Sequence, residues 1–205
     1  MTGFSTPAHL DPAYRRALRL GAALNLAMLF IEGGIGFAVG SAALLADAAD
    51  FLEDASIYGL AVVAIGWSPR WRGWAAGAQG FAMAGVGVAA LAQIVRRLFE
   101  GGAPPSSAIA ATALLALAVN VFCAWQLARF RGGDASMRSI WLSTRNDAIL
   151  NALTIFAAAL IAATGSGWPD IAAGALIAAI NLWAAAEVLW KARRELAAAA
   201  QVGAG

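Results

Sequence analysis

Four carboxylates, Asp47, Asp50, Glu53 and Asp54, lie within eight residues of a segment that is otherwise rich in Ala, Leu, Val and Ile. An ionised side chain in the middle of a bilayer costs at least about 2.5 kcal/mol, so such residues usually face a protein interior and have a function. On a helix Asp47, Asp50 and Asp54 share one face, and carboxylates on one stripe repel each other unless protons or a cation intervene. The pattern predicts half of a cation site.

A second polar stripe lies nearly a hundred residues later. Ser143, Asp147 and Asn151 recur at intervals of four residues, which places them on one face of a helix, and all three can offer oxygen to a cation. If the two helices face each other, Asp50, Asp54 and Asp147 meet. Ser143 is then a weaker fourth ligand or the holder of a water molecule.

Other polar side chains are candidates for accessory roles. Asp47, Glu53, Asn146 and Asn151 are possible additional ligands next to the two stripes. Glu32 shares a face with Asn25 in the first apolar segment, where the two either line a route or form hydrogen bonds between helices.

Imidazole and thiolate ligands are not expected in this site. The chain has one histidine, His9, in its N-terminal segment, and one cysteine, Cys123, among apolar neighbours. Oxygen ligands suit hard cations, yet zinc also accepts carboxylates at about 2.0 to 2.2 Å. The residues alone leave the identity of the ion open.

The composition excludes an ordinary soluble domain. The 205 residues are 61% hydrophobic and 13% charged, against about 25% charged in typical soluble proteins. The sequence predicts an all-α, polytopic membrane protein without a cleavable signal. Its net charge of +2 gives no indication of nucleic-acid binding.

Six apolar segments are each near the roughly 17 to 25 residues of a spanning helix, at residues 16–37, 42–66, 74–99, 107–130, 139–164 and 170–193. Short connections with turn-forming residues make neighbouring helices antiparallel. We therefore expect an N-terminal tail at 1–15, a six-helix transmembrane domain at 16–193 and a short C-terminal tail at 194–205.

The basic residues predict the orientation, because cytoplasmic loops are enriched in Lys and Arg. All of the 14 Lys and Arg residues except Arg96, Arg97 and Arg145 fall on the side that holds both termini. Both termini are expected to be cytoplasmic.

The chain resembles the cation diffusion facilitators in several stretches. Residues 32–54 read Glu-x7-Gly-Ser-Ala-Ala-Leu-Leu-Ala-Asp-Ala-Ala-Asp-x3-Asp, similar to the first two helices of that family. The pair Ser143-x3-Asp147, followed by Trp168-Pro169-Asp170, resembles the fifth and sixth helices. The segment Arg97-Leu98-Phe99-Glu100 and Asn120 fit as well, so the resemblance covers nearly the whole chain.

The resemblance implies a homodimeric proton antiporter that exports divalent metal from the cytoplasm, and not an enzyme. By position, the four metal ligands are Asp50, Asp54, Ser143 and Asp147. The metal is the substrate and no prosthetic group is implied; zinc is expected first, with cadmium, cobalt, manganese or iron as alternatives. The expected location is a cell membrane, the inner membrane of a bacterium.

Two ligand positions depart from the family pattern. Asp50 stands where zinc-transporting members often have His, and Ser143 stands where His or Asp is usual, so one strong ligand is lost. Because the sequence ends at Gly205, we also expect the family's cytoplasmic C-terminal domain to be absent.

Two other classes of protein remain as alternatives. One is a membrane subunit that binds metal without transporting it, and nothing in the sequence excludes this class. The other is a small aspartate-rich membrane phosphotransferase, but the Asp-Gly-x-x-Ala-Arg element of that class does not occur in the chain.

Overall fold

The computed structural model describes residues 11–64, 67–132 and 135–202, which form helices and no strand. His9 lies outside the described residues. The helices are α1 (Pro12–Val39), α2 (Ala42–Val63), α3 (Pro69–Glu100), α4 (Ser106–Ala128), α5 (Ala135–Thr164) and α6 (Trp168–Val202). The predicted all-α fold is confirmed, and α6 continues as helix through most of the predicted C-terminal tail.

Five of these helices, α1, α3, α4, α5 and α6, are long and apolar enough to cross a membrane. The exception, α2, has 22 residues but carries the four carboxylates of the first stripe within them. The prediction of a polytopic membrane bundle is therefore confirmed, and the four carboxylates of α2 need shielding from lipid.

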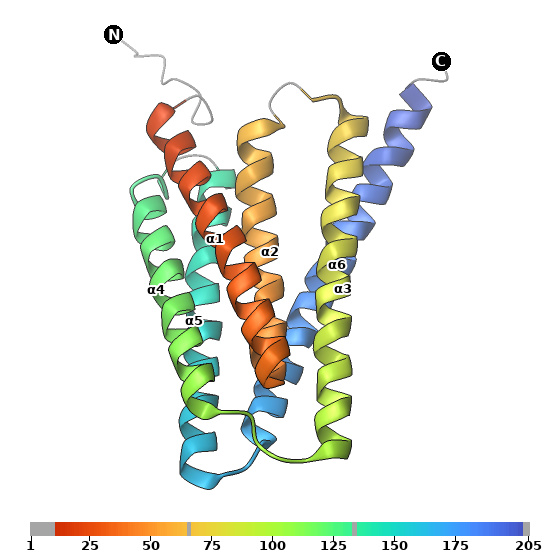
Figure 1. Ribbon diagram of the computed structural model, residues 1–205. Helices are drawn as coiled ribbons and strands as arrows, with labels where there is room; N and C mark the ends of the chain where they lie inside the picture. The colour runs from red at the N-terminus through yellow and green to blue at the C-terminus, as the bar shows by residue number, and fades with distance from the viewer. Residues whose placement is uncertain (1–10, 65–66, 133–134, 203–205) are drawn as a thin grey trace.

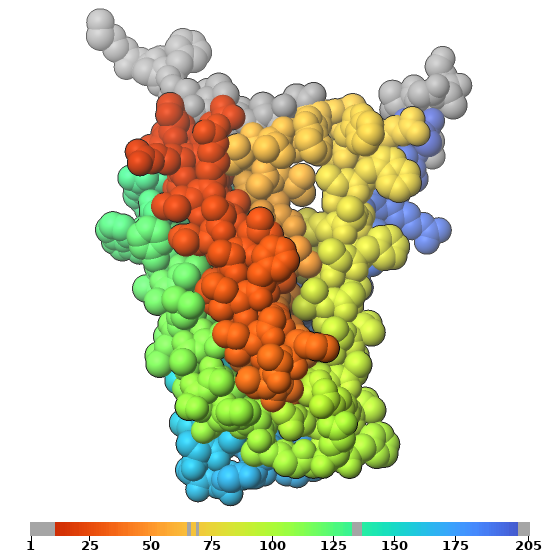
Figure 2. Space-filling model, in the orientation of Figure 1, coloured from red at the N-terminus to blue at the C-terminus, as the bar shows by residue number. Residues whose placement is uncertain are grey.

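The most extensive helix contact joins α3 to α6, which are far apart in the sequence, and the next two join sequence neighbours. The closest pairs are α3 with α6, α1 with α2, and α4 with α5, and α2 contacts all five other helices. The start of α1 and the end of α6 lie at the same end of the bundle, and α6 diverges from α2 toward that end (Figure 1). The space-filling view shows an opening between α2 and α3 near the same end (Figure 2).

A glycine–leucine pattern joins α3 to α6. At seven-residue intervals a glycine of α3 faces a leucine of α6, in the pairs Gly73 with Leu196, Gly80 with Leu189, and Gly87 with Leu182. A Cβ atom on any of these glycines would lie 2.8 to 2.9 Å from the leucine side chain. The missing side chains let the two backbones approach closely, as is common between helices in lipid.

The turn between α1 and α2 is held from one side by α3. Gly40 ends α1 with φ of 70°, a left-handed conformation that favours glycine. Its carbonyl accepts hydrogen bonds from Gln93 Nε2 at 2.8 Å and Arg97 Nε at 2.7 Å. Arg97 Nη2 also donates to the carbonyl of Val39 at 2.6 Å. These bonds satisfy carbonyl groups that the end of a helix leaves without partners.

The same turn is held from the other side by α6. The buried carboxylate of Asp170 accepts hydrogen bonds from Ser41 Oγ at 2.5 Å and from the backbone N–H of Ala42 at 2.7 Å and of Ala43 at 3.3 Å. It thereby caps the positive end of α2. The approach is close because Gly174 lies against Ala42, where a Cβ would come within 2.7 Å of the backbone. We call these contacts from α3 and α6 the α1–α2 clasp.

Candidate metal site

The carboxylates of α2 face the interior of the bundle. Because α2 contacts every other helix, all residues from Ala42 to Phe51 are buried. Asp47 is 0% exposed, Asp50 6% and Asp54 2%. None of the three is exposed, as a simple charge at a helix end would be.

Asp54 has the most hydrogen bonds of the three. Its Oδ2 accepts a hydrogen bond of 2.8 Å from the hydroxyl of Tyr58, one turn further along α2. Thr144 Oγ1 of α5 lies 3.4 Å from the same oxygen and is hydrogen-bonded to the Tyr58 hydroxyl. Two hydroxyl groups from different helices thus gather on one carboxylate oxygen.

Asp147 brings the second carboxylate-bearing helix to this point. Its carboxyl group lies close enough to those of Asp54 and Asp50 to interact electrostatically. One turn later, the buried Asn151 donates to the backbone carbonyl of Asp147 at 2.8 Å, and its Oδ1 has no hydrogen-bond partner. Ser143 is half-buried on the same helix. The structure therefore brings the predicted pair of stripes together.

Further carboxylates continue the acidic face along α2 to α1. The carboxyl groups of Glu32 and Asp47 lie beside each other, and Asp47 lies beside Asp50. Both oxygens of Glu32, both of Asp47, and Oδ2 of Asp50 are buried and accept no hydrogen bond from the described residues. Such a row of facing carboxylates is stable only when it shares protons or a cation.

Two of the predicted accessory residues lie at the margin. Glu53 is half-buried and faces Glu187 of α6, which itself pairs with Lys191 at 2.5 Å. Asn146 is exposed and accepts a hydrogen bond from Arg145 at 3.2 Å, so in this structure it points away from the carboxylates.

Buried amides line the neighbouring contact between α1 and α4. Asn25 donates to the carbonyl of Gly21 at 2.9 Å and contacts Cys123 Sγ at 3.9 Å. Oδ1 of Asn25 and Oδ1 of Asn120 have no hydrogen-bond partner among the described residues. Cys123 thus packs within the bundle, as its apolar neighbours predict.

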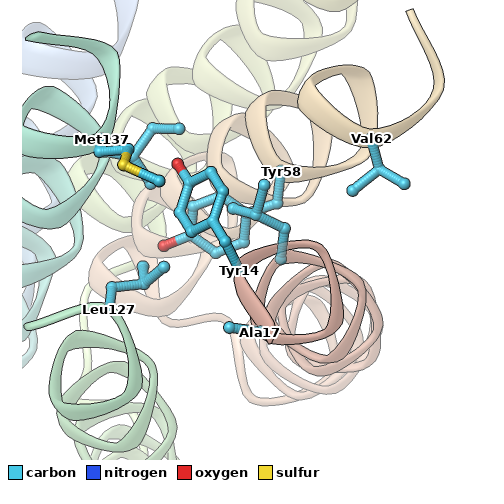
Figure 3. Packing of buried hydrophobic residues seen from close by; sticks show 8 residues of the cluster. Tyr14, Ala17, Tyr58, Val62, Leu127 and Met137 are labelled. Atoms are coloured by element: carbon cyan, nitrogen blue, oxygen red, sulfur yellow. The ribbon is translucent and has the colours of Figure 1, made fainter. Parts of the chain in front are cut away.

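An apolar layer closes the four-helix part of the bundle on the side of the carboxylates nearer the chain ends. Figure 3 shows Tyr58 of α2 among Tyr14 of α1, Leu127 of α4 and Met137 of α5. The layer also contains Leu18, Val62 and Ile140. This layer leaves no direct path to the carboxylates through the centre of these four helices at this end.

The described residues contain no group of three His, Cys, Asp or Glu side chains already spaced to hold a metal ion. What the arrangement provides is acidic oxygen from two helices, α2 and α5, facing one another in a protein interior. A set of hard oxygen ligands of this kind suits a divalent cation.

Sequence reasoning did not identify Tyr58 or Thr144. The available signals were the spacing of Tyr58 four residues after Asp54, and the position of Thr144 beside Ser143. From the sequence alone, both residues could equally be ordinary helix-packing residues. Only the contact between α2 and α5 shows that they lie beside Asp54.

Fold and site together define a polytopic membrane protein with a buried carboxylate cluster between two helices. Residues 74–197 match the cation efflux transmembrane domain, so the chain belongs to the cation efflux family, whose members are transporters. The matched region includes Ser143 and Asp147 and begins after α2. The sequence has no match among curated proteins.

Proposed function

We propose that this protein exports a divalent metal ion, zinc first, from the cytoplasm in exchange for protons. The ion binds between α2 and α5 to Asp50, Asp54 and Asp147, with Ser143 as a weaker fourth ligand. Family membership supports cation efflux in general, and the facing carboxylates of α2 and α5 support this location.

The burial of the carboxylates carries the proposal. Asp54 is 2% exposed and Asp50 is 6% exposed, both in α2, which packs against five helices that are long and apolar enough to cross a membrane. Charged side chains in this setting usually mark the path of an ion or proton. No ion pair with Lys or Arg neutralises them among the described residues, whose salt bridges are Arg96–Glu100 and Lys191–Glu187.

Exchange for protons follows from the choice of ligand. A carboxylate must be deprotonated to bind a metal ion, so the metal and protons compete for the same oxygens. Glu32 and Asp47 extend the row of acidic groups beyond the site and offer further positions for protons. Loading from one side of the membrane and protonation from the other then gives antiport.

The shape of the bundle supports loading from the cytoplasm. The opening between α2 and α3 lies toward the end of the bundle where α1 begins and α6 ends (Figure 2). The positive charges of the sequence predict that this end is cytoplasmic. At the opposite end the α1–α2 clasp joins α3 and α6 to α1 and α2.

We further propose that the protein works as a homodimer in the inner membrane of a bacterium.

The test is metal-driven proton flux in proteoliposomes. We expect Asp50→Asn, Asp54→Asn and Asp147→Asn each to abolish the flux that zinc drives in the wild-type protein. Glu195→Gln, which removes an exposed carboxylate from α6, is the control and should leave the flux unchanged. Wild-type flux in the three site variants would place the ion elsewhere. Zinc binding without flux in the wild-type protein would instead support a non-transporting subunit.

A further inference from the structure

Tyr58 and Thr144 converge on the oxygen of Asp54 that we expect not to bind metal. The Tyr58 O–H donates to Asp54 Oδ2 at 2.8 Å, and Thr144 Oγ1 is within 3.4 Å of that oxygen. The Tyr58 and Thr144 hydroxyls are also hydrogen-bonded to each other. Since Tyr58 uses its one proton toward Asp54, Thr144 is the donor in the bond between the hydroxyls.

We propose that Tyr58 and Thr144 are positioning residues that fix the carboxylate of Asp54 for the metal ion. They hold Oδ2 and leave Oδ1 as the oxygen that binds, so that Asp54 is a ligand through one oxygen. The inference rests on the proposed metal site and adds two residues that make no contact with the ion.

The packing around Tyr58 prevents its hydroxyl from turning away. The side chain is 0% exposed. Its ring lies against Gly21 of α1, where a Cβ would come within 2.7 Å of a ring carbon. Tyr14 and Leu18 of α1 and Ile140 of α5 belong to the same apolar cluster. The ring position, and with it the position of the hydroxyl, is therefore set by contacts from two other helices.

Thr144 is held equally well on its own helix. It is 0% exposed, and its hydroxyl lies 3.0 Å from the carbonyl of Ile140, one turn earlier in α5. The Ile140 carbonyl is an alternative acceptor that the single proton of Thr144 can reach, and the oxygen of Thr144 stays at the contact between α2 and α5 with either acceptor. Partners that orient a ligand in this way typically change metal affinity by about 10- to 100-fold when removed.

One-oxygen binding by Asp54 has a consequence for the choice of ion. Zinc is usually four-coordinate, with few ligands at short distances. Manganese prefers more oxygen ligands in an octahedral arrangement. When Oδ2 accepts the hydrogen bond from Tyr58, which Thr144 supports, Asp54 contributes one oxygen, and this suits zinc. When Oδ2 is released, Asp54 can offer both oxygens, which reduces the disadvantage of manganese.

The experiment measures Zn²⁺ and Mn²⁺ affinity of the purified full-length protein by calorimetry. The test variants are Tyr58→Phe and Thr144→Val, which remove a hydroxyl and keep the shape of the side chain. Thr154→Val is the matched control, because Thr154 is 0% exposed in α5 and its hydroxyl bonds only to the carbonyl of Leu150 among the described residues. Thr144→Ser restores the hydroxyl without the methyl group.

We expect Tyr58→Phe and Thr144→Val to lower zinc affinity by about 10- to 100-fold, and manganese affinity by less. The double variant should lose little more than either single variant, because the two hydroxyls act as one unit. Thr144→Ser and Thr154→Val should bind zinc as the wild type does. A change in the ratio of the two affinities separates positioning from a general loss of stability.

Asp54→Asn distinguishes failure of this inference from failure of the site itself. If Asp54→Asn abolishes zinc binding while Tyr58→Phe and Thr144→Val bind both ions like the wild type, the site stands and the positioning role is wrong. An equal loss in Thr144→Val and Thr154→Val would also overturn it. If Asp54→Asn binds zinc normally, the proposed site fails and the inference fails with it.

Discussion

Replacing Asp170 by Asn tests how strongly the α1–α2 clasp holds the end of the bundle. The carboxylate accepts hydrogen bonds from the hydroxyl of Ser41 and from two backbone N–H groups of α2, at 2.5, 2.7 and 3.3 Å. The carbonyl oxygen of Asn can replace Oδ1, which serves Ser41 and Ala43. The NH2 group of Asn then takes the place of Oδ2 and faces the N–H of Ala42. Neither of these two donors has an acceptor there.

The expected cost follows from these contacts. A buried donor without a partner costs about 1 to 3 kcal/mol, and loss of a negative charge at a helix N-terminus adds up to about 2 kcal/mol. We expect Asp170→Asn to lower the free energy of unfolding by about 2 to 4 kcal/mol on these principles. Ser41→Ala, which removes one hydroxyl, should lose about 1 kcal/mol.

Denaturant unfolding of the protein in mixed micelles measures both effects, with Glu195→Gln of α6 as an exposed control. The same variants in proteoliposomes should show weaker metal transport, because the clasp fixes the register of α2 against α6. An unfolding free energy for Asp170→Asn within about 0.5 kcal/mol of the wild type, the range of ordinary surface substitutions, would refute the reasoning.

Three further substitutions test the packing and the ligand set. Gly80→Ala places a Cβ 2.8 Å from Leu189 and should lower thermal stability relative to Gly85→Ala, which meets nothing within 4 Å; equal midpoints for the pair would contradict close packing of α3 on α6. Gly21→Ala places a Cβ 2.7 Å from the Tyr58 ring and should lower zinc affinity, whereas Gly34→Ala on the same helix meets nothing within 4 Å and should not. Calorimetry on both variants checks this, and unchanged zinc affinity in Gly21→Ala would show that the ring position is unimportant. Ser143→His adds an imidazole, a ligand that suits zinc, and should raise zinc affinity in the same assay; weaker binding would show that Ser143 does not face the ion.

Much of the candidate site could be predicted from helical periodicity. The spacing of Asp47, Asp50 and Asp54 placed them on one face, and the cost of exposing charge to lipid put that face inside. The structure buries all three. On α5, Asn151 is likewise buried and Asp147 is half-buried, and the shared periodicity explains why two distant segments could be matched to each other.

The contacts that depend on how two helices are placed against each other could not be predicted. Tyr58 meets Thr144 across 86 residues of sequence, and this pairing depends on the offset between α2 and α5. Asp170 meets Ser41 across 129 residues for the same reason. No local rule gives such an offset, since it results from the packing of all six helices.

Helix ends were also less predictable than helix faces. The second apolar segment was predicted to extend to residue 66, but α2 ends at Val63. The last apolar segment was predicted to end at residue 193, but α6 continues to Val202 and includes the charged residues Arg194 and Glu195. Polar residues can extend a helix beyond its apolar span, so the end of an apolar segment does not predict where the helix ends.

The most direct test of the central claim is anomalous scattering at the zinc edge from crystals of the protein grown with zinc. We predict a peak between α2 and α5, with carboxylate oxygens of Asp54 and Asp147 at about 2.0 to 2.2 Å from the ion. A fully occupied zinc peak elsewhere in the protein, with the Asp54 and Asp147 carboxylates free of metal, would contradict it.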